Sequence, residues 1–203
     1  MSQDPLVLVQ LGFILGRARI YLSPEEVEQA GLNQYPNFVN AMSNNMLKDF
    51  FGLFMKDLDL ETPKKPADIY KKMLDEKELS NKVALLNLCD SFVNAFVNMG
   101  SGKDSLLLKK IAEGETPWIN EVKENGMMST TASLGMIYLW NFEDGMSVID
   151  EYRDLQDGFL KAGACIAIGL ATSGVWNEND PAKAILLDSL ETNDNAIKTG
   201  VAM

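Results

Sequence analysis

Histidine is absent from the 203 residues of this chain. The absence excludes Ser–His and Cys–His nucleophile pairs, and it excludes zinc sites built on imidazole ligands. Acid–base catalysis near neutral pH would have to use carboxylates or lysines with shifted pKa values. The acidic residues fall on the polar faces of expected helices, which argues against a dry pair of carboxylates. We therefore predict no catalytic residues, and a carboxylate-based small-molecule enzyme stays as a minor alternative.

Basic residues are the second shortage. Eighteen Lys and Arg residues stand against 29 Asp and Glu residues, which gives a net charge of −11 and a pI of about 4.5. No basic cluster is larger than the pairs Lys64-Lys65 and Lys71-Lys72, whereas nucleic-acid binding needs a basic surface. An anionic membrane surface is disfavoured for the same reason. We expect no nucleic-acid or membrane partner, and an acidic protein suits basic partners.

Cysteine is scarce as well, and the two that occur, Cys89 and Cys165, lie in apolar stretches. We predict two buried free thiols and no disulfide framework. The first residues lack the basic segment and the cleavage site of a signal peptide. The apolar run at residues 6–15 is too short to span a bilayer. These features predict a reducing compartment, the cytoplasm or the nucleus.

No cofactor motif is complete. The segment Gly100-Ser-Gly-Lys-Asp104 resembles a phosphate-binding loop, but Val97 stands where the first glycine belongs and Asp104 stands where Ser or Thr belongs. Residues 177–180 carry Asn and Asp without the spacing of a calcium loop. Their position before Pro181 is typical of a helix cap. We predict no cofactor and no metal ion.

What the chain does have is helical periodicity along most of its length. Apolar residues recur at intervals of three and four, and no segment alternates convincingly as a β-strand would. The segment Ser23-Pro24-Glu25-Glu26 is typical of a helix start, and Pro63 and Pro66 mark a break. We predict an all-α fold, with a helix starting at Pro24 and others near residues 7–19, 37–57, 68–74 and 83–97.

The C-terminal third repeats itself. Residues 129–137 align with residues 163–171, and a third copy begins at residues 200–203. Gly135 and Gly169 are 34 residues apart, and a period near this value fits one helical hairpin per repeat. The sequence therefore predicts stacked helical hairpins in this part of the chain.

Each repeat is expected to contain an inner helix of small and aliphatic residues, a turn, and an amphipathic outer helix. The outer helices are expected at residues 146–155 and 181–190. Trp140 and Trp176 end the inner helices, where tryptophan is more often a packing anchor than a ligand platform. Small residues let neighbouring helices approach closely. The residues predicted to pack between repeats are Ala132, Gly135, Gly163, Ala164, Ala167 and Gly169.

The repeats divide the chain into two parts. We predict an irregular helical segment at residues 1–125, followed at residues 126–203 by two complete hairpins and the start of a third. A half repeat leaves an apolar face without a partner. We therefore expect the sequence to be a piece of a longer protein, in which the repeats continue as an α-solenoid.

The repeats and several segments before them resemble one known family. Residues 126–140 are similar to the first proteasome/cyclosome repeat of the scaffold subunits in the base of the proteasome regulatory particle. Similar segments follow in the same order along nearly the whole chain, at residues 13–17, 66–71, 91–98, 126–140, 161–164 and 173–182. The segments outside the repeats favour the branch of non-ATPase subunit one over the sister scaffold subunit, which stays as the alternative.

This resemblance implies a non-catalytic scaffold whose repeats close into an α-helical toroid. The family's toroid sits on the ATPase ring with other base subunits. It docks ubiquitin and the ubiquitin-like domains of shuttle receptors or of a deubiquitinase, and so supports recruitment of ubiquitinated substrates. The resemblance implies a location in the cytoplasm and nucleus. The shuttle-receptor site falls mostly on repeats after Met203, whereas the deubiquitinase site falls on residues 140–155.

The docking segment has the pattern of an amphipathic helix. Ile149 and Tyr152 share one face, and the opposite face carries mostly acids. Ubiquitin-like partners in this family present an apolar patch ringed by basic residues, so the charges complement each other. A solvated helix face is the alternative interpretation, and Ser147 and Val148 stand where family members can carry glutamines. The residues predicted to bind a ubiquitin-like domain are Phe142, Glu143, Asp144, Met146, Ser147, Asp150 and Glu151, with Phe142 or Met146 as an apolar anchor.

Overall fold

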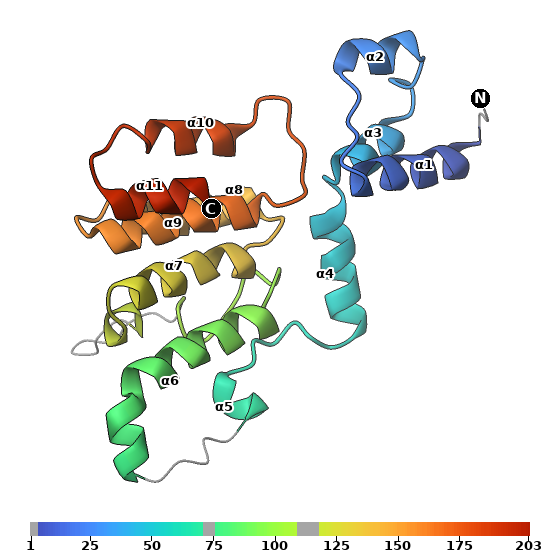
Figure 1. Ribbon diagram of the computed structural model, residues 1–203. Helices are drawn as coiled ribbons and strands as arrows, with labels where there is room; N and C mark the ends of the chain where they lie inside the picture. Colours follow the sequence, from blue (N-terminus) through green and yellow to red (C-terminus); the bar gives the residue numbers. More distant parts are fainter. Residues whose placement is uncertain (1–3, 71–75, 109–117) are drawn as a thin grey trace.

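The computed structural model describes residues 4–70, 76–108 and 118–203, and the regular elements of these residues are all helices, which confirms the all-α prediction (Figure 1). None of the described helices is long and apolar enough to cross a membrane. The helices are α1 (Pro5–Arg17), α2 (Pro24–Gln29), α3 (Pro36–Ser43), α4 (Leu47–Asp57), α5 (Pro66–Ile69), α6 (Glu76–Val97), a 3-10 turn η1 (Trp118–Glu121), α7 (Asn125–Ile137), α8 (Phe142–Arg153), α9 (Gly158–Ala171), α10 (Pro181–Asp188) and α11 (Asn195–Ala202).

Proline and capping side chains set many of the helix starts. Helices α1, α2, α3, α5 and α10 each have a proline in the first turn, where the missing N–H would have had no intrahelical partner. The predicted start at Ser23 is confirmed, because Ser23 and Glu26 form a reciprocal capping box. Asp157, Asp180 and Asp194 cap α9, α10 and α11 through their carboxylates.

The inner helices form the stack that the repeats predict. Figure 1 shows α6, α7 and α9 as successive layers, with α11 lying against α9. Within this stack, backbones meet at three glycines: a Cβ added to Gly135, Gly163 or Gly200 would lie 2.2 Å from Ala167 O, 2.4 Å from Met128 O or 2.4 Å from Ala162 O. These distances are far below normal contact, so only glycine allows the helices to approach this closely.

The other small residues predicted at this interface do not all lie there. Ala132, Ala164 and Ala167 are buried, but Gly169 is exposed and a Cβ added to it would meet nothing within 4 Å. The prediction for Gly169 is wrong because of helical geometry. A residue two positions after Ala167 is rotated by about 200° and faces away from α7.

Among the described residues, buried apolar side chains form two separate clusters. The repeat cluster lies between α7, α8 and α9 and is built around Leu134, Ile137, Ile149 and Ile168. The N-terminal cluster joins α1, α2 and α3. Its buried members are Leu8, Val27, Leu32, Phe38 and Met42. Each cluster removes large side chains from water, which is the dominant favourable term in folding.

The predicted helix at residues 37–57 is interrupted, and the reason lies far away in the sequence. Asn44 adopts a left-handed conformation (φ 62°) between α3 and α4, which asparagine tolerates better than most residues. Its side-chain amide donates to Gly174 O at 2.7 Å, and the backbone N–H of Trp176 donates to Ser43 O at 2.9 Å. The break therefore lets the α3–α4 corner dock against the turn that follows α9.

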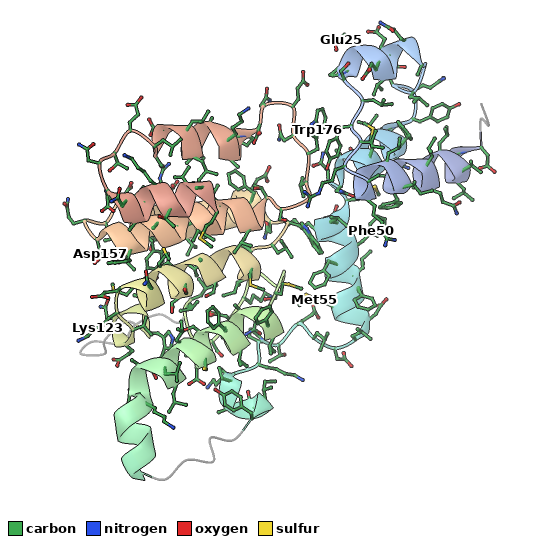
Figure 2. All side chains as sticks on the ribbon, in the orientation of Figure 1. Glu25, Phe50, Met55, Lys123, Asp157 and Trp176 are labelled. Atoms are coloured by element: carbon green, nitrogen blue, oxygen red, sulfur yellow. The ribbon has the colours of Figure 1, made fainter. Side chains whose placement is uncertain are left out.

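Aromatic side chains complete this junction. Trp176 stacks on Tyr21 with ring centroids 5.6 Å apart, and Trp140 meets Phe51 edge-on at 5.5 Å. Figure 2 shows Trp176 at the place where the loop after α9 reaches the N-terminal helices. The two tryptophans thus anchor the turns of both repeats against the N-terminal helices.

A buried polar ladder joins α6 to its surroundings. The Asn94 amide donates to Asp104 Oδ2 at 2.6 Å and its Oδ1 accepts from Asn98 at 3.0 Å. Ser91 accepts hydrogen bonds from the Trp118 indole and from the Thr130 hydroxyl of α7. These side chains have almost no exposed surface, apart from Trp118 and Asp104, which are partly exposed, so the ladder depends on every partner being present.

The predictions for two helices and for the burial of the two cysteines have mixed outcomes. The helix at residues 83–97 lies within α6, and of the helix expected at residues 68–74 only the part up to Tyr70 falls within the described residues, where α5 ends at Ile69. Cys165 is a buried free thiol, and burial raises its pKa. The prediction that Cys89 is buried is wrong: it lies on the outward face of α6.

Candidate functional site

The segment predicted to dock a ubiquitin-like domain is helix α8. The helix begins at Phe142 rather than at Met146, so the residues expected in a turn form its first helical turn. Gly145 permits this start, because a Cβ there would lie 2.6 Å from Tyr138 Cβ. The acids Glu143 and Asp144 therefore stand at the N-terminal end of a helix, where negative charge is favourable.

The inner side of α8 belongs to the repeat core. Ile149 is fully buried, and Phe142, Met146, Val148 and Tyr152 pack against the same cluster while keeping part of their surface exposed. Phe142 and Met146 can thus present only part of their side chains to a partner. The core contacts hold α8 firmly, so its outer residues have fixed positions.

The outer side of α8 carries exposed acids. Glu143, Asp144, Ser147 and Glu151 are all exposed, and Glu143, Ser147 and Glu151 follow one another at intervals of four along the helix. Residues at this spacing lie on one face. We call Glu143, Ser147 and Glu151, with Asp144 beside them, the acidic face of α8.

Two of the predicted acids already have partners within the chain. Asp144 accepts a hydrogen bond from the Asn141 amide at 2.8 Å and lies 3.4 Å from the Lys48 ammonium of α4. Asp150 is half-buried and lies 3.0 Å from Arg153 Nε. Glu143 and Glu151 form no ion pair with a described residue. These two glutamates are therefore the acids of α8 that remain available to an outside cation.

The environment of Asp144 makes a testable prediction about its titration. The hydrogen bond from Asn141, and then the charge of Lys48, lower the pKa of the Asp144 carboxyl. We expect Asn141→Ala and Lys48→Met each to raise this pKa toward its ordinary value, because each substitution removes a cause of the lowering. Carbon-detected NMR of the carboxyl against pH measures both changes. An unchanged pKa in the Asn141→Ala variant would contradict the role assigned to this hydrogen bond.

The lowered pKa of Asp144 determines how the contribution of this carboxyl to folding stability changes with pH. A carboxyl whose pKa is lowered by folding stabilises the folded state above its unfolded pKa. That contribution is lost as the pH falls through the folded pKa. High salt should weaken only the part that comes from Lys48, because both groups are exposed.

The described part of the chain offers little support for a metal site or a phosphate-binding loop. It contains no group of three or more Cys, Asp or Glu residues placed to hold a metal ion. The N–H groups of Gly100 and Gly102, in the segment that resembles a phosphate loop, donate to Met136 O and Ile137 O at the end of α7. That segment therefore caps a helix. The buried carboxylate of Asp90 accepts a hydrogen bond from Tyr70, whose pKa is raised to about 12, chiefly by burial.

Sequence reasoning missed the contribution of the N-terminal helices to this site. Lys48 reaches Asp144 from α4, 96 residues away in the sequence, and Phe51 supports Trp140 just before α8 begins. No local pattern signals such contacts. The lone lysine in the first turn of an exposed helix is the signal that could have suggested a partner acid.

Comparison with known proteins agrees with the resemblance seen in the sequence. Residues 1–75 match the family described as the RPN1 N-terminal domain. The chain is 35% identical over 198 residues to the 26S proteasome non-ATPase regulatory subunit 2 of Dictyostelium discoideum, covering 98% of the chain and 21% of that protein. It is 35% identical over 191 residues to 26S proteasome regulatory subunit rpn-1 of Neurospora crassa, covering 92% of the chain and 20% of that protein.

A third relative is similar to the same extent. The 26S proteasome regulatory subunit rpn1 of Schizosaccharomyces pombe is 37% identical over 186 residues, covering 89% of the chain and 20% of that protein. The chain thus spans about one fifth of the length of the curated relatives it matches. From the family match at residues 1–75 and the similarity along almost the whole chain, we conclude that this chain belongs to the family of the proteasome non-ATPase regulatory subunit RPN1.

Proposed function

We propose that this chain is part of a non-catalytic scaffold in the base of the proteasome regulatory particle, and that the acidic face of α8 docks a ubiquitin-like domain. The observation that carries the docking proposal is that Glu143 and Glu151, which form no ion pair with a described residue, lie on the outer side of a helix whose inner side is buried. The names of the relatives favour RPN1 over the sister scaffold subunit.

The packing supports a scaffold role. Contacts of backbone against glycine, as between Gly135 and Ala167, leave little freedom for one repeat to slide on the next. The aromatic junction at Trp140 and Trp176 holds the turns of both repeats against the N-terminal helices. A surface carried on such a body is preorganised, so a partner that binds there loses less free energy to ordering.

Charge supports the choice of partner. The chain carries a net charge of −11, and the ubiquitin-like partners of this family present basic residues around an apolar patch. Opposite charges steer the encounter and suppress wrong partners more than they raise affinity. The exposed parts of Phe142 and Met146, beside the acids, would supply the apolar contact.

The wider assembly is part of the same proposal. The ATPase ring and other base subunits would be the permanent partners of the scaffold, and ubiquitin and shuttle receptors its transient ones, in the cytoplasm and nucleus. Much of the shuttle-receptor surface is expected on later repeats. The interaction assigned to this chain is therefore the one with the deubiquitinase.

Reversal of the two free charges tests the proposal. We expect Glu143→Lys with Glu151→Lys to weaken binding of the deubiquitinase's ubiquitin-like domain about tenfold or more, because two attractive charges become repulsive. Calorimetry at low and at physiological salt measures the loss, which should shrink as salt screens it.

A matched control separates the α8 surface from net charge. Glu28→Lys with Asp57→Lys makes the same change in net charge at exposed positions near the C-terminal ends of α2 and α4, where a positive charge is tolerated. This control should change the affinity less than about twofold. Equal affinities for the α8 variant and the unaltered chain would remove the acidic face from consideration.

A further inference from the structure

A pocket of about 190 Å³ lies where the two repeat turns meet. It opens between the turn before α8, the end of α9 and the start of α10. Its walls are mainly apolar and include three aromatic rings. The larger side chains among the lining residues are Trp140, Phe142, Val175, Trp176 and Pro181.

Contacts outside the pocket fix its aromatic walls. Trp140 donates its backbone N–H to Ala171 O at 2.8 Å and its indole N–H to Ser173 O at 3.1 Å. Trp176 stacks on Tyr21 of the N-terminal helices. Neither ring is free to swing into the pocket, so the hollow is preformed and its aromatic surfaces remain available to a ligand.

The charge of the pocket is negative. Asp180 is the single charged residue among those that line it. Its Oδ1 accepts the N–H of Lys183 at 3.1 Å, and Oδ2 makes no interaction with a described residue. The end of α9 and the start of α10 bring helix ends of opposite sign to the pocket, which offset each other. The carboxylate of Asp180 therefore decides the sign.

We propose that this pocket binds an arginine side chain from a basic segment of a partner protein. A guanidinium is planar and stacks on indole rings, while its three-carbon stem suits apolar walls. Asp180 Oδ2 can accept a hydrogen bond from the guanidinium, and the exposed Glu178 close by adds to the negative potential. The pocket shares Phe142 with the proposed docking surface, but it uses the carboxylate of Asp180 and none of the acids of the acidic face of α8, so it does not depend on the docking proposal.

The tryptophans provide a direct readout. The chain has three tryptophans, and the third, Trp118, is not among the residues that line the pocket and is hydrogen-bonded to Ser91. We expect the peptide acetyl-Gly-Arg-Gly-amide to shift the indole N–H signals of Trp140 and Trp176 in NMR spectra, with half-saturation on the order of 1 mM. The Trp118 signal should stay in place. Absence of shifts at Trp140 and Trp176 would overturn the proposal.

Two further peptides test the chemistry of the ligand. The same peptide with citrulline keeps the shape of arginine and removes the charge, and it should bind at least about threefold more weakly. The same peptide with leucine should also bind more weakly. If citrulline binds as well as arginine, or leucine binds better, the pocket recognises a neutral side chain and the proposal fails.

A conservative variant tests the carboxylate. Asp180→Asn preserves the helix cap and tolerates the left-handed backbone at this position (φ 38°), while it removes the charge. It should weaken arginine binding about threefold or more and leave the melting temperature nearly unchanged. Unchanged binding would contradict the assigned role of Asp180.

The same variants separate this site from the proposed docking face. Asp180→Asn should leave binding of the ubiquitin-like domain intact. In the variant with Glu143→Lys and Glu151→Lys, the concentration of arginine peptide that half-saturates the shifts of Trp140 and Trp176 should change by less than about twofold. If both activities fall together in either variant, the two surfaces form one site and the assignment of a separate arginine pocket fails.

Discussion

Replacing Gly135 by alanine is expected to lower the free energy of unfolding by about 2 kcal/mol. The added Cβ would lie 2.2 Å from Ala167 O and 2.6 Å from Ala167 Cα. Both are backbone atoms, which cannot move aside without displacing α9. The cost exceeds the gain of about 1 kcal/mol that alanine brings to a helix interior. Urea denaturation followed by circular dichroism measures the difference.

Gly169 is the matched control for this substitution. It lies in the corresponding inner helix of the next repeat, but a Cβ there would meet nothing within 4 Å. Gly169→Ala should therefore stabilise the chain by about 0.5–1 kcal/mol, because only helix propensity changes. Equal effects at the two positions would mean that α7 and α9 do not touch through their backbones.

Replacing Asn94 by aspartate is expected to cost about 3 kcal/mol or more at pH 7. The amide that donates to Asp104 Oδ2 at 2.6 Å becomes a carboxylate that repels it, in a side chain with no exposed surface. The hydrogen bond from Asn98 cannot offset the repulsion between a fully buried carboxylate at position 94 and the partly buried carboxylate of Asp104. Urea titration at pH 7 measures the loss, and Asn40→Asp at an exposed position of α3 serves as the control.

The effect of Asn94→Asp should depend on pH in a definite direction. The facing carboxylate and burial raise the folded pKa of the new carboxyl above its unfolded value of about 3.9. The destabilisation then develops as the pH rises above that unfolded value, and it is largely absent at pH 4. A loss that is the same at pH 4 and pH 7 would show that shape, not charge, causes it.

The repeats were predictable because their signal is local. Gly163 and Gly200 are 37 residues apart, near the period of one hairpin, and both lie, like Gly135, where two backbones meet. The start of α2 was equally clear, because a capping serine, a first-turn proline and a glutamate act within four residues. The prediction that Gly169 packs between repeats failed because a repeated position need not have the same neighbour in every repeat.

The remaining features depend on contacts that no local pattern carries. The break at Asn44 is held by Gly174 and Trp176, about 130 residues later. Lys48 of α4 forms an ion pair with Asp144, so fewer acids are free to bind a partner than the sequence suggested. The exposure of α8 acids could be predicted from helical spacing, but their pairing could not.

The most direct test of the account maps the docking surface itself. A ¹⁵N-labelled sample of the chain is titrated with the ubiquitin-like domain of the deubiquitinase, and amide shifts are followed by NMR. The account predicts that the largest shifts fall on the outer side of α8, at Glu143, Ser147 and Glu151, and that Asp157 and the α2 helix stay unchanged. Shifts that avoid α8, or none at saturating partner, would contradict it.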